Sequence, residues 1–235
     1  MSGVLALVGG GEWRTGCTFD AGLLAASGGD EVLILPTAAA YEHPERAVEQ
    51  AERHFAGLGG RARGLMVLRR EDANDEANAA AVAESRFVYL SGGSSMHLRS
   101  VLKDSAVWDA LVAAWHGGAV LAGSSAGAMV LGDPLVDPRG GAFTLGLGLL
   151  APLAVIPHHD TWSPEKARRT IHLGPAGVAL LAIDEETAAI ADPATGWRVE
   201  GAGTAVVFRN GTRAALDALP LIGDPPPQRK RPGSD

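Results

Sequence analysis

Short, continuously apolar runs alternate with longer helix-like runs along the first two-thirds of the chain, and this alternation constrains the fold more than any other feature. The apolar runs lie at residues 4–8, 31–35, 65–68, 86–90 and 119–122. Helical patterns separate them, at residues 19–26, 44–58, 75–84, 96–102 and 106–115. Strands that are apolar on both faces and are separated by helices are typical of a parallel sheet that is covered on both sides. The sequence therefore predicts an α/β fold with a mostly parallel sheet sandwiched by helices.

The pattern changes in the C-terminal third. A strand at 153–156 and a helix at 164–172 are followed by short strands at 178–183, 187–191, 198–199 and 204–209, and an Asn210-Gly211 turn signal ends the series. We expect these to add antiparallel strands to one edge of the sheet. No linker and no internal repeat interrupts the pattern, so residues 1–223 are predicted to form a single domain. The proline- and arginine-rich residues 224–235 are predicted to be a disordered tail.

Charge and composition exclude several classes of protein. The 20 basic and 27 acidic residues give a net charge of -7, which argues against a nucleic-acid surface. No apolar run is long enough to span a bilayer, and the start MSGVLALVGGGEW lacks the basic segment of a signal peptide. The single Cys17 excludes an intrachain disulfide and a cysteine-based zinc cluster. We expect a cytoplasmic protein without nucleic-acid or membrane partners, and a homo-oligomer is compatible with the sequence.

A G-x-S-x-G motif is the strongest chemical signal. Gly123, Ser125 and Gly127 follow an apolar strand directly and precede a helix-forming run, which is the context of a nucleophile elbow. Glycine on both sides leaves room for a sharp turn that exposes the serine hydroxyl. The backbone N–H of Ala126 would then donate to an oxyanion beside Ser125. The alternative interpretation is a glycine-rich turn that packs a helix against a strand.

Two further glycine-rich loops end predicted strands. Gly92 and Gly93 follow the strand at 86–90, where ligands bind in open α/β sheets, and Gly93 is a candidate second oxyanion donor. A simple tight turn is the competing interpretation. The segment GGGE at residues 9–12 follows the first strand and could line the same crevice. It does not match a dinucleotide fingerprint, because Arg14 occupies the position of the third glycine.

A serine nucleophile needs a base, and the best-placed histidines are His158 and His159. Both follow the strand at 153–156 and so lie at a carboxyl end of the sheet, whereas the other five histidines lie in or beside predicted helices. A plain polar loop or a metal site using His158, His159 and Asp160 are the alternatives, although no further ligand cluster supports a metal. Asp133, or less favourably Asp137, is the candidate acid that orients the imidazole, and either could instead be a turn residue before proline.

These pieces together resemble the serine peptidases typified by peptidase E and cyanophycinase. The matching elements are LALVGGGE, the SGG loop, GSSAGA, LGLGL followed by VIPHH, AIDEETA, and the W-x-V-x-G-x-G pattern from Trp197. The resemblance implies a fold like the class I glutamine amidotransferase domains, with serine replacing cysteine at the elbow. It implies Ser125 as the nucleophile, His158 as the base with His159 one residue away as the alternative, and oxyanion donors at Ala126 and in the Gly92–Gly93 loop.

Departures from the family pattern bear on the substrate. Cyanophycinases tend to carry Gly-Gly-Asp-Gln where this chain has Gly92, Gly93, Ser94 and Ser95, so cyanophycin is a disfavoured substrate. In peptidase E a basic residue beyond the histidine meets the acidic side chain of the substrate, and Arg168 and Arg169 are candidates here. Gly92, Ser94, His159 and Arg168 are therefore the predicted substrate-binding residues, although Arg168 and Arg169 would equally suit a solvated helix face.

The sequence thus predicts a serine peptidase that hydrolyses small peptides and needs no cofactor or metal. Two other functions stay open: a catalytically silent member of the fold that binds a small ligand or partner, and an esterase that uses the same residues. A cysteine-dependent amidotransferase is disfavoured, because the elbow carries Ser125 and Cys17 lies near the first predicted helix.

Overall fold

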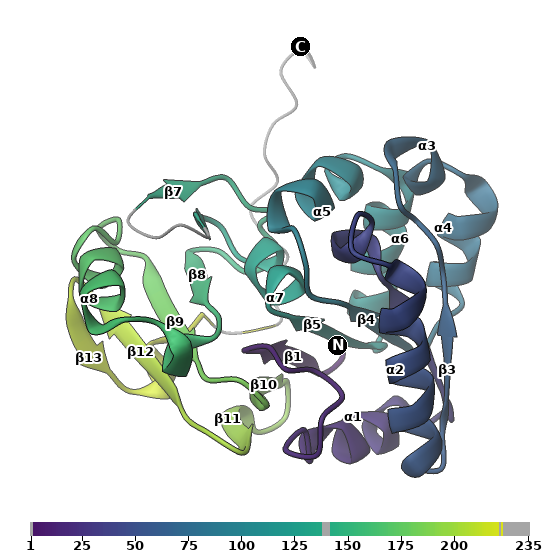
Figure 1. The fold of residues 1–235 in the computed structure, drawn as a ribbon, viewed down its shortest axis with the longest axis horizontal. Helices are drawn as coiled ribbons and strands as arrows, with labels where there is room; N and C mark the ends of the chain where they lie inside the picture. Colours follow the sequence, from purple (N-terminus) through teal and green to yellow (C-terminus); the bar gives the residue numbers. More distant parts are fainter. Residues whose placement is uncertain (1, 138–141, 221, 223–235) are drawn as a thin grey trace.

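A computed structural model describes residues 2–137, 142–220 and 222 (Figure 1). Its central sheet has seven strands in the order β11-β10-β1-β5-β4-β2-β3. The five parallel strands are β1 (Leu5–Val8), β2 (Glu31–Leu35), β3 (Arg61–Gly64), β4 (Phe87–Leu90) and β5 (Val120–Ser124). Four of them consist mainly of buried apolar residues, as expected for strands with helices on both faces.

Alternating residues of the central strands pack into two separate cores. Ala6 and Val8 of β1 face α1 (Phe19–Ser27) and α2 (Pro44–Gly57). Leu5 and Leu7 face the opposite layer. That layer contains α3 (Arg70–Ala73), α4 (Glu76–Ala83), α5 (Ser95–Leu102), α6 (Ala106–His116) and α7 (Ala126–Leu131). The predicted α/β sandwich with a mainly parallel sheet is confirmed.

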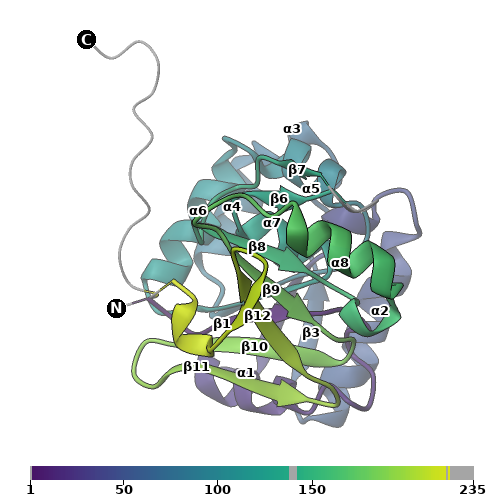
Figure 2. The same cartoon turned by 90° about the vertical axis from the view of Figure 1, so that its left-hand side faces the viewer.

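The C-terminal third contributes to two sheets. β10 (Thr187–Asp192) extends the central sheet antiparallel to β1, and β11 (Gly196–Gly201) pairs antiparallel with β10 at the edge. A second sheet has the order β13-β12-β9-β8 and faces the viewer in Figure 2. Its strands are β8 (Leu153–Ile156), β9 (Ala179–Ile183), β12 (Ala205–Arg209) and β13 (Thr212–Ala214). The expected antiparallel strands are therefore present, but the expectation that all of them join one sheet edge is wrong.

The remaining elements are short connections. Helix α8 (Pro164–His172) links β8 to the parallel strand β9, and a small hairpin pairs β6 (Leu135–Val136) with β7 (Phe143–Thr144). Three 3-10 turns complete the described chain: η1 (Thr37–Ala39), η2 (His159–Thr161) and η3 (Leu216–Ala218). The predicted tail at 224–235 lies outside the described residues. Among the residues that the structure describes, none of the helices combines the length and apolar character needed to cross a bilayer.

One predicted strand is displaced. The apolar run 65–68 is irregular, and the strand β3 is the preceding polar segment Arg61–Gly64. This strand forms the edge of the sheet beside β2, where Glu31 accepts hydrogen bonds from Arg61 and Arg63. An edge strand with charged side chains needs no continuous apolar run, because one of its sides faces solvent.

The topology brings three loops together at one end of the sheet. Strands β1, β5 and β4 are neighbours and run parallel, so the segments that follow them emerge at the same edge. These segments are the Gly9–Glu12 loop, the Ser125 elbow and the Ser91–Ser94 loop. The carboxyl ends of strands are where open α/β sheets bind ligands.

Candidate active site

Ser125 occupies a strained turn between β5 and α7. Its φ of 48° and ψ of -106° are rare for a residue with a side chain. A Cβ on Gly123 would lie 2.6 Å from the carbonyl carbon of Gly127, and one on Gly127 would lie 2.4 Å from the carbonyl oxygen of Leu90. The two glycines therefore permit the close packing that the turn requires. The backbone N–H of Ser125 donates to Val8 at 2.9 Å and fixes the turn to β1.

His158 reaches Ser125 from the end of β8. The Ser125 Oγ and His158 Nε2 atoms are 2.8 Å apart. The backbone N–H of His158 donates to the carbonyl of Gly9 at 2.7 Å. A Cβ on Gly10 would lie 2.1 Å from the imidazole Cε1, so only glycine leaves room for this ring. The structure thus brings the two predicted residues Ser125 and His158 into hydrogen-bond contact.

Glu185 completes the chain of hydrogen bonds. His158 Nδ1 lies 2.8 Å from Glu185 Oε1, and Glu185 Oε2 accepts a bond of 3.2 Å from Arg14. The loop that carries this acid joins β9 to β10. The bonds that hold its backbone include those from the Glu185 N–H to Asp160 Oδ1 at 3.0 Å and from the Glu186 N–H to the Gly10 carbonyl at 2.7 Å.

The structure contradicts the expectation that Asp133 or Asp137 orients the imidazole. Asp133 Oδ1 instead accepts the backbone N–H of Gly146 at 3.0 Å, and the Asp137 N–H donates to the carbonyl of Ala142. Both belong to the segment after α7, where Asp133 bridges to Leu153. Asp133 therefore holds the glycine-rich loop at 145–149, and the acid against His158 comes from a later part of the chain.

The predicted oxyanion donors flank Ser125. Ala126 is the first residue of α7, so its N–H has no acceptor within that helix. Gly93 has a φ of 132°, and a Cβ there would lie 2.3 Å from the carbonyl oxygen of Ala38. The neighbouring amides are already bonded, that of Gly92 to Glu12 Oε1 at 2.8 Å and that of Ser94 to the Ala38 carbonyl at 2.8 Å.

A pocket of about 310 Å³ opens beside the Ser125 hydroxyl. It is lined by Gly93, Ser95, Ser125, Met129, Pro157, His158, Thr161, Trp162, Ser163 and Lys166. The Lys166 ammonium lies 3.6 Å from the centre of the Trp162 ring, and burial lowers the pKa of this lysine. Such a cavity is at the lower end of the roughly 300–1,000 Å³ typical of small-molecule sites. Its lining thus combines the Ser125 hydroxyl, an aromatic side chain and one cation.

The residues predicted to bind the substrate do not line this pocket. Arg168 is exposed and is not among the residues that line the pocket, where Lys166 supplies the basic group. The His159 ring is 3.6 Å from Asp184. Ser94 caps α5 by accepting the N–H of His97 at 3.3 Å.

The described residues contain no group of three or more histidine, cysteine or acidic side chains that could hold a metal ion.

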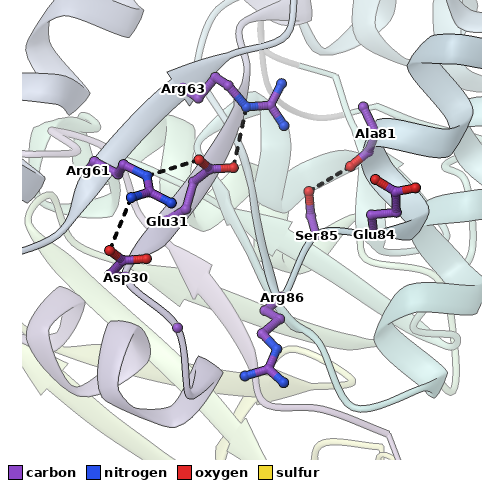
Figure 3. A pocket seen from close by; sticks show the side chains of 9 residues that line it. Asp30, Glu31, Arg61, Arg63, Ala81, Glu84, Ser85 and Arg86 are labelled. Carbon is purple, nitrogen blue, oxygen red and sulfur yellow. Dashed lines mark hydrogen bonds and ion pairs between the residues drawn. The ribbon is translucent and has the colours of Figure 1, made fainter.

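A second pocket of about 260 Å³ lies at the opposite, amino-terminal ends of the strands (Figure 3). Arg61, Arg63 and Arg86 line it together with acidic residues. Glu31 accepts bonds from both Arg61 and Arg63, Asp30 pairs with Arg61, and Arg86 donates to the carbonyl of Gly28. Its charges are largely paired with one another, and it holds no nucleophile–base pair.

Comparison with known proteins assigns the family. The sequence pattern of peptidase family S51 matches residues 5–194. The chain belongs to peptidase family S51. Two curated relatives, cyanophycinases from Synechococcus elongatus and Thermosynechococcus vestitus, are each 27% identical over 154 residues. These matches cover 61% of this chain and 48% of the relatives, so the chain matches about half the length of each cyanophycinase.

Solved structures agree with the family assignment. A peptidase from an acI-B1 Actinobacterium is 29% identical with a TM-score of 0.79, and the match covers 91% of this chain and 93% of that one. A protein from Listeria monocytogenes EGD-e, named as a peptidase E, is 16% identical with a TM-score of 0.66 and covers 86% and 100%. The Listeria protein shares the fold at this level of identity. The predicted resemblance to the peptidase E and cyanophycinase family is confirmed.

Proposed function

We propose that this S51 protein is a serine peptidase that hydrolyses small peptides through Ser125, His158 and Glu185. The observation that carries the proposal is the continuous chain of two 2.8 Å contacts from Ser125 Oγ through the imidazole to Glu185. A hydroxyl bonded to a base that is itself bonded to a carboxylate is the arrangement that activates serine at neutral pH.

The reaction follows from these contacts. Ser125 Oγ attacks the amide carbonyl while His158 Nε2 takes its proton, and Glu185 stabilises the imidazolium that forms. The N–H groups of Ala126 and Gly93 donate to the oxyanion of the tetrahedral intermediate. His158 then returns the proton to the leaving amine. Water, deprotonated by His158, hydrolyses the acyl-enzyme and restores Ser125, so the chemistry requires neither a cofactor nor a metal.

The pocket supports a small substrate with an acidic group. A volume of about 310 Å³ is suited to a short peptide. Lys166 is the basic side chain in its lining, and a half-buried ammonium attracts a carboxylate more strongly than an exposed one does. We therefore expect peptides with an acidic residue beside the cleaved bond to be preferred.

Fluorophosphonate labelling tests the nucleophile. The wild-type protein should be labelled and Ser125→Ala should not, with both proteins showing the same thermal unfolding midpoint. Dipeptides and the matching amino-acid esters, assayed in parallel, then separate peptide from ester hydrolysis. A wild-type protein that is neither labelled nor active on any of these substrates would indicate a binding function instead.

A dipeptide library tests the acidic preference. Lys166→Met should lower kcat/KM for acidic substrates by about 10-fold to 100-fold, the effect of losing one charge-assisted contact of 1.5–3 kcal/mol. Activity on neutral dipeptides should fall much less. Arg168→Met is the matched control, because it removes a positive charge from the exposed side of the same helix. Equal selectivity in wild type and Lys166→Met would exclude Lys166 from substrate recognition.

A further inference from the structure

Glu12 lies at the end of the GGGE loop and makes contacts that the proposed mechanism does not use. Its Oε1 accepts the backbone N–H of Gly92 at 2.8 Å, and its Oε2 accepts the hydroxyl of Ser124 at 2.7 Å. Gly92 precedes the oxyanion donor Gly93, and Ser124 precedes the nucleophile Ser125. One carboxylate therefore joins the residues immediately before two groups that must act together.

The contacts around Gly93 show what this connection does. Its N–H lies between two bonded amides, since the Gly92 N–H is bonded to Glu12 and the Ser94 N–H to the Ala38 carbonyl. The bond from the Ser94 N–H to the Ala38 carbonyl fixes the loop to η1. On the side of the nucleophile, the Glu12 carboxylate holds the loop through the Gly92 N–H. A Cβ on Gly92 would lie 2.9 Å from Glu12 Oε1 and 3.5 Å from the Ser125 Cβ, so the loop, the acid and the nucleophile are closely packed.

We propose that Glu12 is a positioning residue that sets the distance between the Gly93 oxyanion donor and the Ser125 hydroxyl. This inference rests on the proposed peptidase function. An oxyanion donor stabilises the transition state only when it is placed within about 0.5 Å of its working position. Glu12 acts through Gly92 and Ser124, and it is not among the residues that line the substrate pocket.

The alternative role for a carboxylate here is to bind the ammonium group of a peptide substrate. Both Glu12 oxygens are already engaged by protein donors, which favours positioning. The two roles also differ in kinetics. A substrate contact would raise KM for peptides and leave labelling by an amine-free fluorophosphonate unchanged, whereas a positioning role lowers kcat and slows labelling together.

The test compares Glu12→Ala and Glu12→Gln with two further variants. Glu12→Ala removes both bonds. Its kcat and labelling rate should fall about 10-fold to 100-fold, with little change in KM. This is less than the roughly 10²-fold to 10³-fold loss of kcat that follows removal of a whole oxyanion donor. Glu12→Gln should restore most of the rate, because its amide can accept from Gly92 and donate to Ser124. Ser124→Ala removes one bond and should give an intermediate loss.

Asp72→Asn is the matched control. Asp72 is also a half-buried carboxylate that accepts two backbone amides, those of Leu68 and Arg69 at 2.9 and 3.0 Å, but it lies at α3 away from the site. Its replacement should leave kcat and labelling unchanged. Hydrogen exchange provides a readout that does not depend on activity: the Gly92 amide should exchange slowly in the wild type and faster in Glu12→Ala.

The outcomes separate this inference from the proposed function. If the wild type is labelled but the Glu12 variants are labelled equally fast, or only KM changes, the positioning role is wrong and the peptidase proposal stands. If Glu12→Ala does not fold, a Ser124→Ala protein that keeps the wild-type kcat and labelling rate would equally overturn the positioning role. If the wild type is not labelled, the proposed function fails, and with it any role of Glu12 in catalysis.

Discussion

The side chains that form the candidate site come from distant parts of the sequence, and each is held through its own backbone as well as through its neighbour. Ser125 and His158 are separated by 33 positions, and His158 and Glu185 by 27. Backbone bonds to Val8, Gly9 and Asp160 fix the three residues independently. Such preorganisation reduces the reorganisation needed during the reaction.

Glu185→Gln should lower kcat by about 10²-fold to 10⁴-fold, as removal of the orienting acid does in other serine triads. A neutral amide cannot stabilise the imidazolium of His158. Asp133→Asn is the matched comparison, because asparagine retains the oxygen that accepts the Gly146 N–H, and its kcat should stay near the wild-type value. Steady-state assays of both variants show which acid orients His158. A large loss of kcat confined to Asp133→Asn would indicate that Asp133 is the orienting acid.

Cys17 should be unreactive in the folded protein. Its side chain is 2% exposed, and burial raises the pKa of the thiol to about 12. At pH 8 the group is therefore almost entirely protonated, and only the thiolate is nucleophilic. A colorimetric thiol reagent should react with one cysteine per chain in urea and with none in the native state. Rapid native modification that abolishes hydrolysis would contradict this.

The proposed nucleophile and base were predictable from sequence, and the proposed acid was not. Ser125 lies in a motif with fixed spacing, and His158 follows a strand that points at the same sheet edge. Glu185 lies in a run of three acids between two strands, Asp184, Glu185 and Glu186. Only the three-dimensional path of β9 into β10 determines which of them meets the imidazole. Lys166 was missed for a similar reason, because the orientation of α8 against the rest of the fold decides which of its basic side chains lines the pocket.

Among the strands of the central sheet, the buried strands were predicted best and the edge strand β3 worst. Strands β1, β2, β4 and β5 coincide with apolar runs to within two residues. β3 has the sequence RARG and forms through pairing with β2, so no local apolar pattern marks it. The division of the C-terminal strands between two sheets likewise depends on long-range pairing, which periodicity does not contain.

Helix α4 offers a test at the level of one element. Its N-cap, Asp75, accepts the N–H groups of Ala77 and Asn78 at 2.8 and 3.1 Å. Asp75→Ala should destabilise the protein by about 1 kcal/mol and lower Tm by about 2–4 °C. Asp75→Asn, which keeps the cap, should have a much smaller effect. Calorimetry measures both, and kcat should not change because α4 contributes no residue to the pocket lining.

At the level of the whole molecule, the two sheets share one core. The larger apolar cluster includes Leu5 and Leu121 of the central sheet, Leu153 and Leu181 of the second sheet, and α7 between them. The sequence predicts a single domain for residues 1–223, and this continuous core is the physical reason to expect cooperative unfolding.

Leu181→Ala tests the prediction of one domain. The side chain is fully buried in β9, and its truncation should cost about 2–5 kcal/mol. In a single cooperative unit, far-ultraviolet circular dichroism and tryptophan fluorescence should report the same, lower urea midpoint. Wild-type protein should show one coincident transition as well. Two separate transitions, only one of which moves in the variant, would show that the sheets unfold independently.

The position of Glu185 has a consequence for how catalysis depends on the fold. The residue occupies the crossing from β9 of the second sheet to β10 of the central one, while its partner His158 follows β8. Both residues therefore follow strands of the second sheet, whereas Ser125 follows β5 of the central one, so a slight slippage between the sheets would lengthen the Ser125–His158 contact before any strand was lost. The rate of hydrolysis should then fall at temperatures or denaturant concentrations below those at which spectroscopy detects unfolding.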